Sequence, residues 1–143
     1  MSQYQKLIST GIVLAVVTSG VAGAVAGLAL DDIVANRALL AVAAAFLAVL
    51  AAMVVRHFTI FASIRAAGPG PGRLLIPGVV LLNWVVASVA GGLAGYGLSL
   101  SILSPPPAAW IGCLSGVIAA VSMELLMIGY RSTVQAVGAV GRS

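Results

Sequence analysis

The sequence predicts an all-α membrane protein whose four helices each cross the bilayer. Hydrophobic residues make up 62% of the 143 residues and charged residues 7%, whereas a soluble domain carries roughly 25% charged residues. The apolar residues gather in four stretches, and each approaches or exceeds the roughly 20 residues that cross a ~30 Å hydrocarbon layer as a helix. We expect spans at about residues 7–30, 38–55, 74–98 and 108–130, within a single four-helix domain covering residues 1–143.

The basic residues predict the orientation of the chain. Only Arg37, beside Asp31 and Asp32, lies on one side of the spans, and the other basic residues lie on the opposite side: Lys6, Arg56, Arg65, Arg73, Arg131 and Arg142. The positive-inside rule therefore predicts that both termini face the cytoplasm, in what we expect to be a bacterial inner membrane. These residues form no basic stripe, so nucleic acid is not expected as a partner.

The start of the chain allows one competing interpretation. Lys6, the apolar run after it and the small residues at 22–24 resemble a secretory signal with a cleavage site. The run of residues 7–30 is longer than the apolar core of a usual signal, which favours a membrane span.

The breaks between the stretches predict where the first two helices end. The turn after the first span contains Asp32 and Asn36, and either side chain could cap the second helix by accepting a backbone N–H bond. No helix breaker follows Val55 until Gly68, so we expect the second helix to continue beyond the membrane to about residue 66. The alternating glycines and prolines of residues 68–72 then end it.

Prolines mark the starts of the third and fourth helices. Pro77 lies near the start of the third helix, where a missing N–H group costs little. The connection at 99–107 ends in three prolines, which form a stiff extended segment. Pro107 could be the first helical residue of the fourth span.

Small residues recur at intervals of four in three of the spans, and each row lies along one face of its helix. Such a face lets another helix approach closely, which is how helices associate in a membrane. We therefore expect the first, third and fourth helices to pack tightly, with the second helix, which has alanines but no glycine, more peripheral. The contacts could lie within the monomer, in a homo-oligomer or against another membrane subunit. The rows consist of Ser19, Gly23 and Gly27; Gly91 and Gly95; and Gly112, Gly116 and Ala120.

Two segments of the chain resemble each other. Residues 21–30 align without gaps on residues 89–98 with six identities, and the same offset sets Arg56 against Glu124. Two parallel hairpin repeats, related by an axis along the membrane normal, would explain the likeness. Chance similarity between two stretches of small and aliphatic residues is the alternative.

Glu124 is the candidate intramembrane polar site, together with Asn83 at a comparable depth in the third span. It lies four residues after Ala120, on the row of small residues that is expected to face another helix. An acidic side chain within a span is costly, and such residues often serve function. Glu124 could pair structurally with Arg56, Arg131, Asn83 or a hydroxyl, or stay protonated. It could instead carry a proton or cation, or contact a cationic partner.

The composition argues against an enzyme and gives no sign of a cofactor or metal. His57 is the only histidine, Cys113 is the only cysteine, and acidic residues number three. Metal sites and nucleophilic catalysis both need clusters of such groups, which this chain does not supply. We therefore expect no catalytic residues, bound cofactor or metal ligands.

Two functions are compatible with this composition. The first is a non-catalytic accessory, assembly or scaffold subunit of a larger membrane complex, because packing motifs are many and polar residues few. The second is a small channel or transporter that works as an oligomer, with Glu124 and Asn83 beside the path. In both cases the surroundings are the lipid bilayer, and the partners are further copies of the chain or other membrane subunits.

Overall fold

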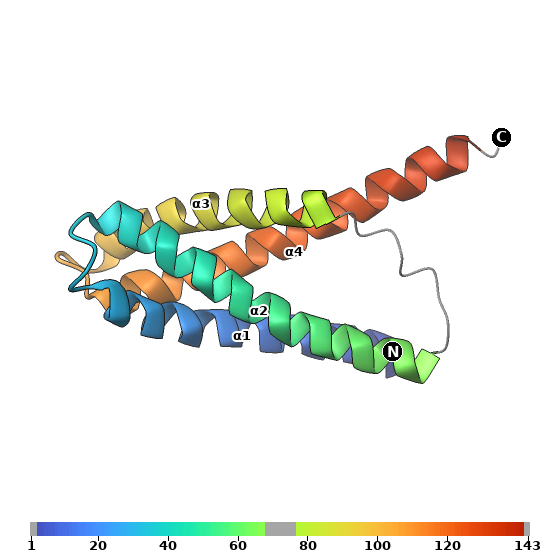
Figure 1. The fold of residues 1–143 in the computed structure, drawn as a ribbon, viewed down its shortest axis with the longest axis horizontal. Helices are drawn as coiled ribbons and strands as arrows, with labels where there is room; N and C mark the ends of the chain where they lie inside the picture. The colour runs from blue at the N-terminus through green and yellow to red at the C-terminus, as the bar shows by residue number, and fades with distance from the viewer. Residues whose placement is uncertain (1–2, 68–76, 142–143) are drawn as a thin grey trace.

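The computed structural model describes residues 3–67 and 77–141, and these residues form helices joined by short connections (Figure 1). The helices are α1 (Gln3–Leu30), α2 (Arg37–Ala67), α3 (Pro77–Ile102) and α4 (Ala108–Val140). All four are long and apolar enough to cross a membrane. The prediction of four helices that are able to span a membrane is therefore confirmed, and the described residues contain no strand.

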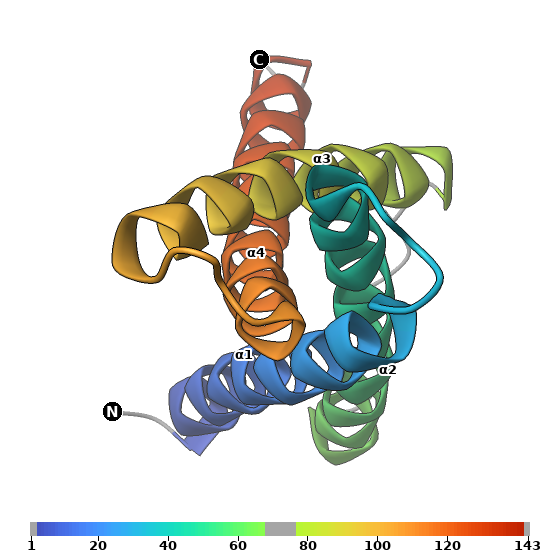
Figure 2. The ribbon, with the colours of Figure 1, turned by 90° about the vertical axis from the view of Figure 1, so that its left-hand side faces the viewer.

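In the view along the bundle, α1 and α3 lie on opposite sides, and between them lie α2 and α4 (Figure 2). Each of these two helices contacts the three others, whereas α1 and α3 do not meet within the described residues. The expectation that the second helix is peripheral is therefore wrong. Alanine is small enough to allow close packing without glycine, and Ala41, Ala44, Ala45 and Ala48 of α2 are completely buried.

Both short connections lie at the same end of the bundle, which we call the turn end (Figure 1). At residues 31–36, the Asn36 side chain caps α2, because its Oδ1 accepts hydrogen bonds from the N–H groups of Ala38 at 3.0 Å and Leu39 at 3.2 Å. Before α4, Pro107 has an extended backbone and is the N-cap residue. It is therefore not the first helical residue, although its carbonyl accepts the N–H bond of Ile111.

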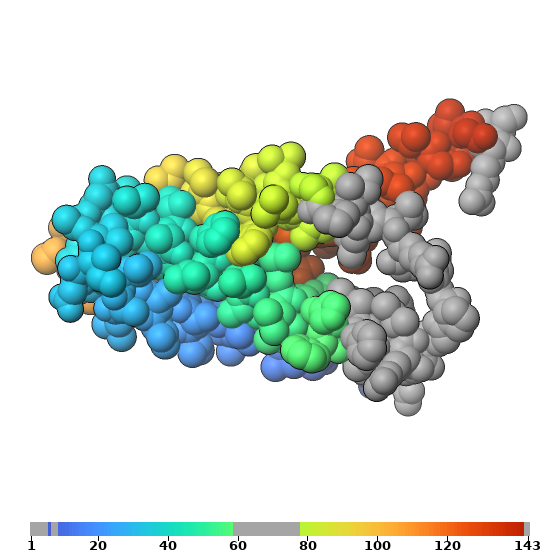
Figure 3. All heavy atoms as spheres, in the orientation of Figure 1, coloured from blue at the N-terminus to red at the C-terminus, as the bar shows by residue number. Residues whose placement is uncertain are grey.

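The opposite end, which we call the basic end, holds Lys6, Arg56 and Arg131. Here α4 stands clear of the other described residues (Figures 1 and 3). Its 33 residues are about 50 Å long, well above the ~30 Å hydrocarbon thickness. The predicted boundary at residue 130 falls short of the helix end because no proline or glycine follows Tyr130 until Gly138.

The other predicted boundaries lie close to the helix ends. The third helix runs to Ile102 rather than residue 98, and the second, expected to reach about residue 66, ends at Ala67. The predicted glycine–proline break at 68–72 and the predicted start of the third span at 74–76 lie outside the described residues.

Candidate functional site

An ion pair between Arg56 of α2 and Glu124 of α4 is the main polar feature of the bundle. The Arg56 Nε lies 2.7 Å from Glu124 Oε1, and Nη2 donates to Oε2 at 3.3 Å. Two parallel contacts of this kind fix the guanidinium against the carboxylate more firmly than a single contact. The two side chains are only 16% and 19% exposed, so the pair is largely removed from the surroundings.

The pair forms because small residues bring α2 and α4 together one turn before it. Ala52, four residues before Arg56, and Ala120, four residues before Glu124, are both buried. Counted at ~1.5 Å per residue from the helix starts, Glu124 lies about 24 Å and Arg56 about 29 Å from the turn end. In a ~30 Å hydrocarbon layer these depths place the pair near the boundary at the basic end.

This location decides the energetics of the pair. A single charged side chain inside a span costs several kcal/mol, and less near the boundary. A partner of opposite charge offsets that cost only when the two groups are close and well aligned and their hydrogen-bonding atoms have partners. Removal of one partner from a buried pair leaves an uncompensated charge and costs about 3–5 kcal/mol. Arg56 and Glu124 therefore hold α2 against α4, where neither charge would be stable alone at this depth.

A small cavity of about 30 Å³ adjoins the pair. This volume exceeds the ~10–15 Å³ that one water molecule needs, and the two charged groups supply polar partners for such a water. The cavity is too small for a larger substrate in this conformation. It is lined by Ala15, Val49, Ala52, Met53, Arg56, Ala120, Met123 and Glu124.

The other sequence-predicted candidates do not join Glu124. The Asn83 Nδ2 donates to the Sδ of Met127 at 3.5 Å, one turn beyond Glu124 on α4. Arg131 lies further along α4 and is exposed. The structure thus brings together Glu124 and Arg56, and leaves Asn83 in a separate contact between α3 and α4.

A contact between α2 and α3 was not predicted from the sequence. The rings of Trp84 and Phe46 stack with centroids 4.2 Å apart and planes 14° from parallel. The Trp84 Nε1 also donates a hydrogen bond to the carbonyl oxygen of Phe46 at 3.1 Å. A tryptophan seven residues into an apolar helix was the only signal available in the sequence, because the identity of its partner depends on how the helices are arranged.

The predicted small-residue rows lie in contacts within the monomer. A Cβ atom added at Gly23 or Gly27 of α1 would collide with the backbone of α4. A Cβ atom added at Gly91 or Gly95 of α3 would also collide with α4. In the opposite direction, a Cβ atom added at Gly112 of α4 would collide with Gly23 of α1. A Cβ at Gly116 would lie 2.9 Å from the Cβ of Ala48. The α1 and α4 helices therefore approach until their backbones touch.

Buried hydroxyl groups complete these close contacts. The Ser19 Oγ donates to the carbonyl oxygen of Gly116 at 2.7 Å, so the row on α1 is hydrogen-bonded to the row on α4. Ser115 on α4 donates to the carbonyl oxygen of Gly92 on α3 at 3.3 Å. These bonds leave no buried side-chain polar atom without a partner in the described part of the chain. Ala120, the last residue of its row, is also buried.

The described residues contain no group of three or more His, Cys, Asp and Glu side chains that could bind a metal ion. His57 is exposed at the basic end, next to Arg56, and Cys113 is a half-buried free thiol in α4. Searches against protein-family models, curated proteins and solved structures found no match to this chain.

Proposed function

We propose that this protein is a small, non-catalytic subunit that supports the assembly or stability of a larger membrane complex. The observation that carries the proposal is the projecting part of α4. Val137 and Val140 are 68% and 75% exposed, on a stretch of helix that extends past the bundle (Figure 1). Neighbouring apolar side chains that are exposed outside the hydrocarbon layer favour a surface that binds another protein.

The internal packing supports the same proposal. The small-residue rows are occupied by contacts inside the monomer, and the charge of Glu124 is balanced by Arg56. The chain is therefore built as a compact helical unit with few polar groups available for chemistry. We infer that a partner binds at the basic end, on the projecting part of α4, and not on the glycine rows.

Co-purification in a mild detergent tests this proposal. The full chain should retain a membrane-protein partner, and a Val137→Glu/Val140→Glu variant should lose it because charge is placed on the apolar face. Gln135→Glu is the matched control, since it adds a charge to the opposite face of the same helix turn. If the wild-type chain retains no partner, or the double variant retains it as well as the control does, the proposal is wrong.

A second candidate is a small oligomeric channel or transporter that uses Glu124 as a proton or cation site. The presence of a carboxylate beside a water-sized cavity within the span favours it. Flux measured in liposomes, wild type against Glu124→Gln, separates the two functions. Flux that depends on Glu124 would support transport, whereas no flux, or equal flux in both proteins, would exclude this role for Glu124.

We also propose that both termini face the cytoplasm of a bacterial cell and that the chain arose from two hairpin repeats. The gathering of Lys6, Arg56 and Arg131 at one end supports the orientation. The repeat is supported by the contact between Arg56 and Glu124, which are 68 residues apart, the offset that aligns residues 21–30 with 89–98. Equivalent residues of two parallel repeats meet in this way when they lie on the axis between them.

A further inference from the structure

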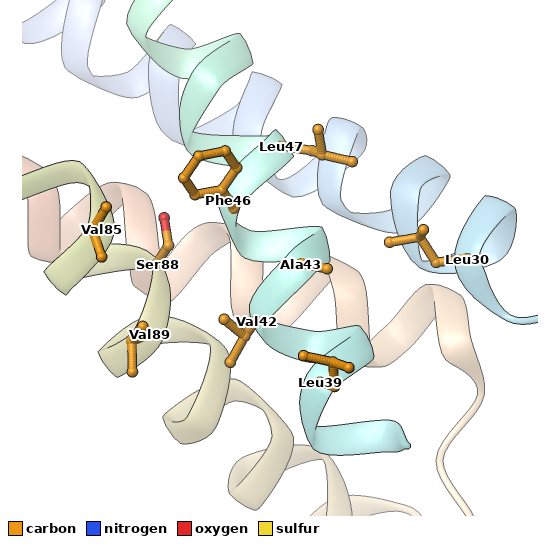
Figure 4. Close-up of a pocket in the computed structure, with 9 residues that line it drawn as sticks. All are labelled: Leu30, Leu39, Val42, Ala43, Phe46, Leu47, Val85, Ser88 and Val89. Carbon is orange, nitrogen blue, oxygen red and sulfur yellow. The ribbon is translucent and has the colours of Figure 1, made fainter. Parts of the chain in front are cut away.

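An apolar groove of about 410 Å³ lies over the outward face of α2, between the end of α1 and the side of α3 (Figure 4). Ala43 is the smallest residue on its α2 side, and Val85 and Val89 of α3 lie along one wall. The other lining residues are Leu30, Leu39, Val42, Phe46, Leu47 and Ser88.

The chemistry of the lining excludes water as the occupant. Ser88 is the only polar side chain in the groove, and its Oγ already donates to the carbonyl oxygen of Trp84 at 2.7 Å. A bound water needs two to four polar partners, which this surface does not offer. The groove lies within the membrane-spanning part of α2, so a hydrocarbon occupant regains the dispersion contacts that an empty groove would lose.

The groove has a direction along the bundle. Phe46, stacked on Trp84, lies at the end away from the turn. Leu30 and Leu39 lie at the end of the groove nearest the turn. Leu30 immediately precedes Asp31, and Leu39 is two residues after Arg37. The distance along α2 from Leu39 to Phe46 is about 10 Å, so a chain entering from the turn end would have its first several carbons in the groove.

The charges at the turn end indicate which headgroup such a chain would carry. Arg37 is paired with Asp31, and both side chains remain substantially exposed. Asp32 adds a second carboxylate, so the turn has two acidic groups and one basic group. A phosphate is attracted to the guanidinium, and an ammonium group is attracted to the carboxylates. An anionic headgroup without an amine would meet an excess of negative charge.

We propose that this groove binds one acyl chain of a zwitterionic, amine-bearing phospholipid, with its headgroup at the turn of residues 31–37. The proposal does not depend on the protein being a subunit of a complex, because the groove and the turn lie at the opposite end from the projecting part of α4.

Lipid retention tests this proposal on the full chain. The protein is reconstituted with equal amounts of phosphatidylethanolamine and phosphatidylglycerol, extracted in mild detergent, and weighed by native mass spectrometry. We expect one retained phosphatidylethanolamine. Ala43→Phe and Val89→Phe should each lower retention about tenfold, the loss expected when some two methylene groups no longer fit. Ala90→Phe, exposed on α3 outside the groove, is the matched control.

A second variant tests the headgroup. Asp32→Asn should remove the preference for phosphatidylethanolamine while a lipid is still retained. The proposal is overturned if the two groove variants retain lipid as the control does at an unchanged thermal midpoint, or if the wild-type protein retains both lipids equally. A disulfide dimer formed by Val89→Cys in a Cys113→Ser background would also overturn it, because a second copy would then cover the groove.

Discussion

Arg56 and Glu124, which are 68 residues apart, meet with Nε 2.7 Å from Oε1. They lie on α2 and α4, the two helices that contact all the others. The pair therefore links the two central helices to each other near the basic end of the bundle. At the turn end, α1 and α4 are held together by glycine contacts that need no charge. The two ends of the molecule are thus stabilised by different kinds of interaction.

Two glycines of α3 that are two residues apart should respond differently to the same substitution. A Cβ at Gly95 would lie 2.5 Å from the Cα of Ser115, whereas a Cβ at Gly97 would meet nothing within 4 Å. Gly95→Leu should therefore force α3 away from α4 and lower the thermal midpoint by several degrees, consistent with a cost of about 1–3 kcal/mol or more for overpacking. Gly97→Leu is the control, and an equal loss in both variants would contradict the observed packing.

The indole N–H of Trp84 contributes a hydrogen bond that phenylalanine cannot make. Trp84→Phe keeps an aromatic ring against Phe46 but removes the bond to its carbonyl, so we expect a loss of roughly 1 kcal/mol in the free energy of unfolding. Trp110→Phe, at an exposed position near the start of α4, should cost less. Chemical denaturation of the reconstituted protein measures both, and a larger loss at Trp110 would refute the assignment.

The cap at Asn36 gives a prediction for the turn end. Asn36→Ala removes the acceptor for the N–H groups of Ala38 and Leu39 and should cost about 0.5–2 kcal/mol, whereas Asn36→Asp should keep the cap. Thermal unfolding in detergent distinguishes the two variants. Equal stability of the alanine and aspartate variants would show that the cap adds nothing.

Cysteine labelling tests the proposed orientation of the chain. In a Cys113→Ser background, Ile33→Cys in the turn should react with a membrane-impermeant maleimide in intact spheroplasts. Ser132→Cys, exposed on α4 at the basic end, should react only after lysis. The reverse pattern would contradict the cytoplasmic placement of the termini. Labelling of both residues in intact spheroplasts would show that the two ends of the bundle do not lie on opposite sides of the membrane.

The number and approximate limits of the helices were predictable because they depend on hydrophobic length and on local breakers. Asn36 was predictable as a possible cap for the same local reason. The central position of α2 was not, because alanine and glycine both permit close packing, and the absence of glycine says little about which helix lies at the centre.

The partner of Glu124 required the arrangement of the helices in space. The sequence places Arg56, Arg131 and Asn83 within possible reach, and only the contact of α2 with α4 selects Arg56. The stack of Trp84 on Phe46 depends on how α2 and α3 are aligned along their lengths, which hydrophobic periodicity does not fix. The extension of α4 to Val140 was underestimated because a helix can outlast its apolar stretch.

A charge exchange between Arg56 and Glu124 tests most directly whether this pair joins α2 to α4 in the bilayer. Each single variant, Arg56→Glu or Glu124→Arg, places like charges together and should lower the free energy of unfolding of the reconstituted protein by about 3–5 kcal/mol. The double variant should recover most of that loss, because an opposite-charge pair is restored. If the losses of the single variants simply add in the double variant, the two residues are not coupled and the account is wrong.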